Sequence, residues 1–282
     1  MSVPVAVNVF LYVRGTKGDP EVLRSVARLA PFFLAGPTLV LVGSFFHGGA
    51  RDGLWIAANV VNLAGALDAG GRTWRVSASH FAERHALFVI IALGESIVAI
   101  GVGAAGHLDL GIGTAAVLGV GLAAALWWSY FDIVALVSAR RLAAAAPGRE
   151  QNELARDSYS YMHLALVAGI VLAAFGIKVT IAHTADHLHA VPAFALLGGV
   201  AVYLLGLVGF RYRHVHTVSR RRLGLAIVLA LLIPVATAIP ALVSLAVVDL
   251  LLVAVIALDT RSYGDGRSRL RQEMSVARAE TP

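Results

Sequence analysis

The sequence is a succession of long apolar runs separated by short polar connections, and this pattern limits the chain to a bundle of membrane-spanning helices. Most runs approach the roughly 20 apolar residues that an α-helix needs to cross a bilayer core. They cover residues 1–13, 29–46, 53–69, 85–105, 110–138, 159–182, 191–210, 222–239 and 241–258. The first is short, and Pro240 separates the last two because proline disfavours helical geometry in the preceding residue. We predict an all-α polytopic transmembrane helix bundle of about eight full spans plus a short N-terminal helix.

The amino-acid composition agrees with a membrane location. Hydrophobic residues make up 58% of the chain and charged residues 14%, whereas a soluble domain carries roughly 25% charged residues. The formal net charge of +6 is spread over short connections rather than gathered on one face, so we expect the lipid bilayer as a partner and no nucleic acid. Cysteine is absent, which excludes disulfides, thiolate metal sites and a cysteine nucleophile.

Lysine and arginine lie in every second connection, and this alternation predicts the topology. The basic positions are Arg14, Lys17, Arg24 and Arg28; Arg72 and Arg75; Arg140, Arg141, Arg149 and Arg156; Arg211, Arg213, Arg220, Arg221 and Arg222; and the tail that begins at Arg261. The intervening connections contain only Arg51. Because short basic loops stay in the cytoplasm, we predict a multi-pass protein with a cytoplasmic C-terminus.

A weak internal repeat suggests how the spans are organised. At an offset of 197 residues, three positions match their counterparts: Arg14 with Arg211, Arg24 with Arg221, and Pro37 with Pro234. An even number of spans separates each equivalent pair, which favours parallel six-helix repeats. We predict one transmembrane domain over residues 1–260, in which residues 1–84 form the second half of a first repeat and residues 85–260 a second repeat. Residues 261–282 form a cytoplasmic basic tail.

Glu95 is the candidate functional residue that composition singles out. From Ala86 to Gly103, only Glu95 and Ser96 are polar, so the carboxylate lies near the middle of its predicted span. A carboxylate at that depth costs roughly 2.5–3.5 kcal/mol on insertion scales and therefore indicates a functional site. The alternative is a neutral glutamate that is hydrogen-bonded for structural reasons.

Other polar residues extend a predicted substrate or ion pathway, and each also has a structural alternative. Glu83 and Arg84 lie at the cytoplasmic mouth of the Glu95 helix, where a solvated helix start would also explain them. Asp132 and His163 lie at the same end of later spans, where interfacial anchoring is the alternative. Asp249 lies well inside its span and could instead hydrogen-bond to a neighbouring helix.

We expect neither a metal nor a cofactor. His183 and His187 have the i, i+4 spacing of a metal-binding pair, with Asp186 and His189 nearby, but a real site needs a third and a fourth ligand in fixed geometry. Hydrolase and phosphate-loop motifs are absent from the sequence, so no catalytic residue is assigned. Glycines within the apolar runs predict close packing of the helices rather than a phosphate-binding loop. They are Gly94, Gly101, Gly103, Gly198, Gly199 and Gly206.

Three motifs resemble the bacterial low temperature requirement A (LtrA) family. They are ERHALFVIIALGES from Glu83, WWSYFD from Trp127 and RDSYSYMHLALVAGIV from Arg156. The resemblance implies a bacterial inner-membrane protein and covers about residues 1–260. Family members usually begin with about three further spans, including an acidic ELFFDLVF-like motif that this sequence lacks. The resemblance therefore implies association with such spans or with further copies of the chain. It supplies no molecular activity.

The sequence therefore favours a secondary transporter or channel-like permease for an unidentified small solute or ion. In this hypothesis Glu95 binds a proton or cation, and the cytoplasmic polar layer orients the substrate. A structural or sensory membrane protein without transport activity is the main alternative. A membrane-embedded enzyme ranks third, because an acid, a base and a histidine are present without a nucleophile or a metal frame.

Overall fold

The structure is a computed structural model that describes residue 14 and residues 20–68, 77–104 and 109–279. These residues form helices and turns, and the β-structure among them is limited to one isolated bridge between His187 and Pro240. The prediction of an all-α chain is therefore confirmed. The predicted short helix over residues 1–13 lies outside the described residues.

The chain divides into two compact units. The first comprises Met1–Ser77 and Ala145–Arg156. Its main element is a hairpin of α2 (Pro20–Gly43) and α3 (Gly49–Asp68), joined by a turn in which Gly48 has a φ of +59°. Both helices pack closely, because a Cβ added at Gly65 would lie 2.5 Å from the Cβ of Phe32. The short helix α7 (Arg149–Leu154) belongs to the same unit.

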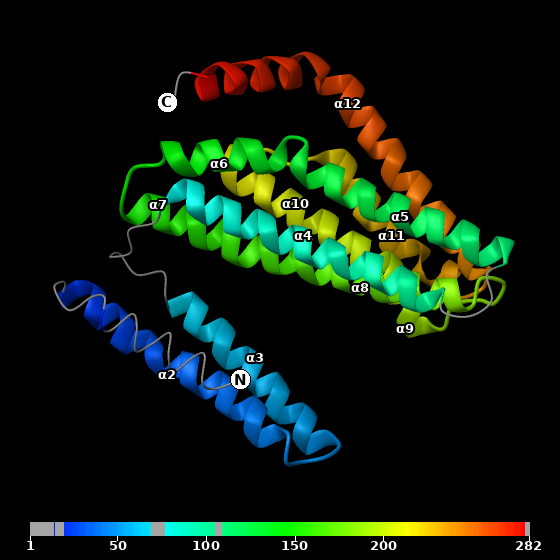
Figure 1. Cartoon of the computed structure of the whole chain (residues 1–282), viewed down its shortest axis with the longest axis horizontal. Helices are drawn as coiled ribbons and strands as arrows, with labels where there is room; N and C mark the ends of the chain where they lie inside the picture. The colour runs from blue at the N-terminus through cyan, green and yellow to red at the C-terminus, as the bar shows by residue number, and fades with distance from the viewer. Residues whose placement is uncertain (1–13, 15–19, 69–76, 105–108, 280–282) are drawn as a thin grey trace. The chain divides into compact units, whose positions relative to one another are not determined.

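The second unit comprises Ala78–Ala144 and Asp157–Pro282 and contains the larger helical bundle. Figure 1 shows its helices in chain order from cyan to red. The α-helices are α4 (Ala78–Gly103), α5 (Leu110–Phe131), α6 (Val134–Ala144), α8 (His163–Ala182), α9 (Ala190–Ala193), α10 (Gly199–Val215), α11 (Arg220–Ala236) and α12 (Ala241–Ala279). Two π-helices, η1 (Ala155–Met162) and η2 (Phe194–Gly198), precede α8 and α10 respectively. The first two residues of η1 belong to the first unit.

Within the residues that the structure describes, five helical stretches are long and apolar enough to cross a membrane: Ala78–Gly103, Leu110–Ala144, Arg149–Ala182, Ala190–Val215 and Ala241–Ser262. The chain is thus an all-α membrane protein, as the hydropathy pattern predicts. The predicted break at Pro240 is also confirmed, since α11 ends at Ala236 and α12 begins at Ala241. The residues of the predicted basic tail continue α12 as far as Ala279.

Glycine brings α8 and the α10 region into backbone contact at the centre of the second unit. A Cβ added at Gly169 would lie 2.6 Å from the Gly199 carbonyl oxygen, and one added at Gly176 would lie 2.6 Å from the Leu196 backbone. The predicted close packing is confirmed for Gly199, and also for Gly103 and Gly206, which face neighbouring helices. Helices without side chains at their contact approach closely enough to gain van der Waals contact throughout, which stabilises membrane bundles.

The packing prediction is wrong for two other glycines. Open space lies next to the Cβ positions of Gly94 and Gly101 on α4, and both residues are exposed. At Gly198, the nearest atoms belong to Phe194 of the same π-helix, so this glycine meets no neighbouring helix at its Cβ position. A sequence shows that a residue is small but not which side of its helix meets a neighbour. Only the glycines of α4 that face the bundle interior can serve close packing.

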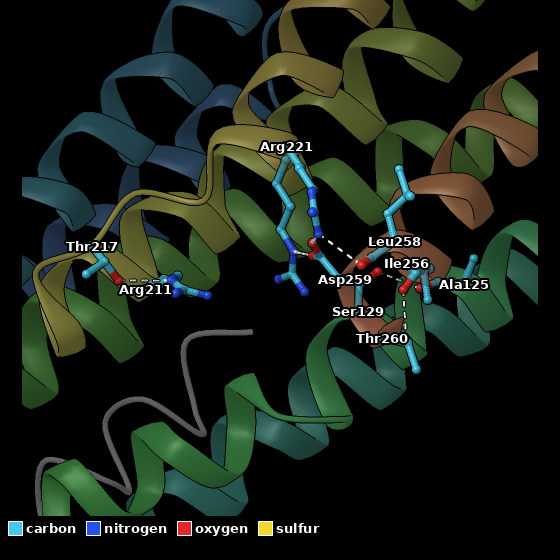
Figure 2. A network of polar contacts seen from close by, with 10 residues as sticks. Ala125, Ser129, Arg211, Thr217, Arg221, Ile256, Leu258, Asp259 and Thr260 are labelled. Atoms are coloured by element: carbon cyan, nitrogen blue, oxygen red, sulfur yellow. Dashed lines mark hydrogen bonds and ion pairs between the residues drawn. The ribbon is translucent and has the colours of Figure 1, made fainter. Parts of the chain in front are cut away.

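An arginine–aspartate network joins the start of α11 to the middle of α12 (Figure 2). The carboxylate of Asp259 is 3.3 Å from both Arg221 Nη1 and Arg222 Nε. Arg221 also donates to the Leu258 carbonyl oxygen at 2.9 Å and to the Ser262 hydroxyl at 2.9 Å. Asp259 is buried, so this pairing compensates the removal of a charge from water.

Candidate histidine–tyrosine site

A group of titratable rings lies inside the second unit, at the ends of four spanning helices. We call it the histidine–tyrosine cluster and define it by His85 of α4, Tyr130 of α5, Tyr159 of η1, His163 of α8 and His214 of α10. Tyr130, Tyr159, His163 and His214 are buried. Antiparallel neighbours bring the start of one helix beside the end of the next, and the five rings therefore meet at one level of the bundle.

The central interaction is a hydrogen bond between Tyr130 Oη and His163 Nε2 at 2.8 Å. His163 Nδ1 lies 3.4 Å from the Ser158 carbonyl oxygen. A carbonyl oxygen can only accept, so Nδ1 carries a hydrogen. In the neutral imidazole, Nε2 then has no hydrogen and accepts from the Tyr130 hydroxyl.

A backbone carbonyl oxygen also determines which ring nitrogen of His85 donates a hydrogen bond. Its Nδ1 lies 2.9 Å from the Phe81 carbonyl oxygen one turn earlier, so this nitrogen donates and Nε2 remains an acceptor. The ring centroids of His85 and His163 are 5.1 Å apart with an interplanar angle of 72°. Two acceptor nitrogens on adjacent rings are thus presented at one level of the bundle.

Aromatic packing determines the orientation of His163. Tyr159 stacks on its ring with a centroid distance of 5.2 Å and an interplanar angle of 11°. Phe210 packs edge-on at 5.1 Å and links the cluster to His214, whose ring lies 4.8 Å from Phe210. Rings held on several sides keep their rotamers, which pre-organises the polar atoms that they carry.

Several polar atoms in and around the cluster lack hydrogen-bond partners among the described residues. They are both ring nitrogens of His214, the Tyr159 hydroxyl and the Ser158 hydroxyl. A buried polar group without a partner costs about 1–3 kcal/mol. Such atoms call for water, a ligand or another polar partner, so this place is a candidate for a functional site.

The local backbone is irregular at the same place. Residues Ala155–Met162 form a π-helix that carries Ser158 and Tyr159 and leads directly into α8. A π-helical turn adds a residue and rotates the side chains that follow, and such turns are frequent at functional sites. Tyr159, which lies in this π-helix, stacks on His163 four positions later in the chain.

Of the residues predicted from the sequence, His163 belongs to the cluster, and Asp132 lies close to it along the chain. Asp132 is buried at the end of α5, two residues after Tyr130. Glu83 and Arg84 are exposed on the first turns of α4, where Glu83 is 3.6 Å from His80. The structure does not bring these two residues into the cluster.

Glu95 and Asp249 lie elsewhere in the second unit. Glu95 is exposed on α4 and makes no hydrogen bond or ion pair with the described residues. Asp249 is partly buried on α12 beside Gly121, and its Oδ1 has no hydrogen-bond partner in the described part of the chain. Of the six predicted pathway residues, His163 is therefore the one that belongs to the histidine–tyrosine cluster, and a shared pathway through all six stays a prediction.

Sequence reasoning missed Tyr130 and His214 as site residues, although a usable signal was present. The alternation of basic connections places the start of α4, the end of α5, the start of α8 and the end of α10 at one side of the membrane. Titratable rings within about one turn of those four ends were therefore candidates for a shared site.

The external histidines form no metal site in the described residues. His183 Nδ1 lies 3.5 Å from Asp186 Oδ2, and His187 forms its β-bridge with Pro240. No group of three or more histidine, cysteine, aspartate or glutamate side chains suited to a metal ion occurs in the part of the chain that the structure describes.

Comparison with known proteins gives a family but no activity. The family model for bacterial low temperature requirement A protein matches residues 1–257. An uncharacterised protein of Rhizobium meliloti (strain 1021) is 30% identical over 235 residues. This alignment covers 76% of the present chain and 56% of the Rhizobium protein, so the chain spans little more than half of that relative. No solved structure matches.

Proposed function

Because the chain belongs to the bacterial low temperature requirement A family of membrane proteins, we propose that it is a proton-coupled transport protein whose proton-binding centre is the histidine–tyrosine cluster. The observation that supports this proposal is the 2.8 Å hydrogen bond between Tyr130 and His163 inside a spanning bundle. Ionisable groups at membrane depth are costly and typically mark ion or proton pathways.

The chemistry follows from the tautomer. In the neutral form, His163 Nε2 is the basic nitrogen and faces a hydroxyl that can give or receive a hydrogen bond. A proton delivered to Nε2 turns the ring into an imidazolium, and Nδ1 can then release a proton toward the Ser158 side. Histidine is suited to this exchange because both nitrogens take part and its unperturbed pKa is about 6.5.

His85 and His214 both lie near this centre. His85 offers an acceptor nitrogen on a ring 5.1 Å from that of His163, and the ring of His214 packs against Phe210 and Tyr159. His85 on α4 and His214 on α10 thus supply further proton-accepting nitrogens around Tyr130 and His163. A small solute or ion carried with the proton completes the proposed mechanism.

The test is proton movement in proteoliposomes that enclose a pH-sensitive dye. A pH step is applied with and without an external mixture of amino acids, sugars, nucleosides and monovalent cations. We expect solute-stimulated proton movement above that of empty liposomes, and its loss in His163→Phe, which keeps an aromatic ring but has no acceptor. Tyr212→Phe is the matched control, because Tyr212 is exposed near the same end of α10. Stimulated movement that survives His163→Phe would refute the proposal.

A structural role is the second candidate, supported by the dense ring packing around His163. In that case the cluster would only fix the positions of α4, α5, α8 and α10. His163→Phe would then lower stability without a specific transport defect, and wild-type proteoliposomes would show no stimulated proton movement.

The proposed location is the bacterial cytoplasmic membrane, with the C-terminus in the cytoplasm. The arginines of the α11–α12 network and the cluster end of the bundle would face the cytoplasm, as the basic connections predict. The chain has no cysteine, so single cysteines at Arg149 and His187 can be labelled without background. In intact cells only the cysteine at position 187 should react with an impermeant reagent, and the reverse pattern would invert the orientation.

A further inference from the structure

A groove of about 480 Å³ runs between α5 and α12 in the second unit. It is lined by Gly121, Ala124, Ala125, Trp128, Val253, Ile256, Ala257, Thr260 and Arg261. The small residues of α5 form its floor, because Gly121, Ala124 and Ala125 leave room that larger side chains would fill. None of these residues belongs to the histidine–tyrosine cluster.

The groove opens on the outer surface of the bundle. Ala124 and Trp128 on one wall and Val253 and Ala257 on the other are all exposed. Both walls belong to stretches that are long and apolar enough to span a membrane, Leu110–Ala144 and Ala241–Ser262. An apolar groove that opens sideways from spanning helices is accessible to lipid chains.

One end of the groove is polar and positively charged. Arg261 and Thr260 line that end, whereas the lining residues toward Gly121 are apolar and the Asp249 carboxylate lies beside Gly121, outside this lining. Arg261 is exposed and lies at the end of its spanning stretch, at the level where lipid headgroups meet water. Trp128 shares this end, as expected for an aromatic residue at the membrane interface.

The neighbouring network strengthens the positive field. Figure 2 shows Arg221 and Asp259 next to the turn of α12 that carries Thr260, with Ala125 and Ser129 of α5 close by. Arg221 and Arg222 share the single carboxylate of Asp259, so this network retains a net positive charge. Basic positions between transmembrane helices on the cytoplasmic side attract anionic lipid headgroups.

We propose that this groove binds an anionic phospholipid, with one acyl chain along the small residues of α5 and the phosphate at Arg261. The groove matches such a lipid in the polarity of its two ends and in their positions along the spanning helices. The apolar part of the groove lies within the spanning stretches, and its charged end lies where a headgroup would be. Arg261 supplies the charge, and Ala124 and Ala257 supply the space.

The test is native mass spectrometry of the full chain in detergent, titrated separately with phosphatidylglycerol and phosphatidylcholine. We expect phosphatidylglycerol to bind more tightly. Arg261→Gln should reduce its affinity about five-fold, since one basic residue near the membrane surface contributes about 1 kcal/mol. Arg220→Gln is the matched control, because Arg220 is exposed near the same end of the bundle but does not line the groove.

A second pair of variants tests the acyl-chain site. Ala257→Phe fills the groove and should weaken the binding of both lipids, whereas Ala230→Phe, at an exposed alanine of α11, should not. Ala124→Phe fills the opposite wall and replaces Ala257→Phe if that variant does not fold. Inorganic phosphate at the same concentration should not compete with phosphatidylglycerol.

Three results would overturn the proposal: equal wild-type affinity for both lipids, an unchanged preference in Arg261→Gln, or unchanged binding in the groove-filling variants. Competition by free phosphate that persists in the groove-filling variants would also contradict it, because that result would indicate an anion site without an acyl chain.

Discussion

Glu95 and His163 are both ionisable residues within spanning helices of the second unit, but they differ in burial and in hydrogen-bond partners. His163 is buried, hydrogen-bonded to Tyr130 and packed against rings from three other elements. Glu95 is exposed on α4 and has no polar partner among the described residues. The comparison teaches that hydropathy identifies a costly residue, whereas the partners that give it a role come from the packing of helices distant in sequence.

The two faces of α4 show the same contrast. Val89, Ala92, Ser96 and Ala99 are buried toward the bundle. The other face carries Glu95 together with exposed apolar side chains such as Phe88, Ile91, Val98 and Val102. The first face therefore contributes to the stability of the second unit, and variants of the second face are expected to affect it little.

The largest effect is expected from glycine substitutions that compare a packed position with an open one. Gly176→Val would force a side chain against the Leu196 backbone, which neither helix can move aside, so we expect a loss of more than about 3 kcal/mol or failure to fold. Gly94→Val meets open space and should fold. Thermal unfolding in detergent measures both variants, and equal melting temperatures would show that the α8–α10 contact is not as close as described.

Tyr130→Phe should have an intermediate effect. It removes the hydroxyl that His163 Nε2 accepts from and leaves a buried acceptor without a partner, at a cost of about 1–3 kcal/mol. The Phe ring preserves the packing, so the loss reports the hydrogen bond. Denaturant unfolding monitored by tryptophan fluorescence provides the measurement. Tyr212→Phe, at an exposed position, should leave the unfolding midpoint unchanged, and a similar result for Tyr130→Phe would remove this bond from the account.

Glu95→Leu should have the smallest effect on folding. Glu95 makes no hydrogen bond or ion pair with the described residues, so its removal should change the free energy of unfolding by no more than about 0.5 kcal/mol. Hydropathy alone supports the opposite expectation, in which a buried glutamate leaves partners unsatisfied when it is replaced. A large drop in melting temperature for Glu95→Leu would show that this residue has a partner and would weaken the contrast with His163.

The sequence was sufficient to predict the helical class, the approximate positions of α2, α3, α4, α5, α8, α10, α11 and the first part of α12, and the break at Pro240, because these features depend on local hydropathy and on proline chemistry. It placed His163 among six candidate pathway residues and gave first place to Glu95. It could not show that Tyr130, Tyr159 and His85 surround His163, because those contacts join four helices. The π-helix η1 also has no sequence signature that hydropathy detects, although it carries Tyr159.

The same limit explains the glycines and the groove. Gly94 and Gly169 look alike in an apolar run, but one faces open space and the other faces the α10 backbone. The sequence does not show that Gly121, Ala124 and Ala257 line one groove, because this depends on the packing of α5 beside α12. Proposed repeats over residues 1–84 and 85–260 stay a prediction, although Pro37 and Pro234 do each lie inside a helix, α2 and α11 respectively.

The most direct test of the central claim compares His163→Phe with Glu95→Gln in the proteoliposome assay of solute-stimulated proton movement. Both variants remove a titratable group from a spanning helix and retain a side chain of similar shape. If the histidine–tyrosine cluster carries the proton, His163→Phe loses the stimulated movement and Glu95→Gln retains it. Retention in His163→Phe together with loss in Glu95→Gln would contradict the account and assign the proton to α4.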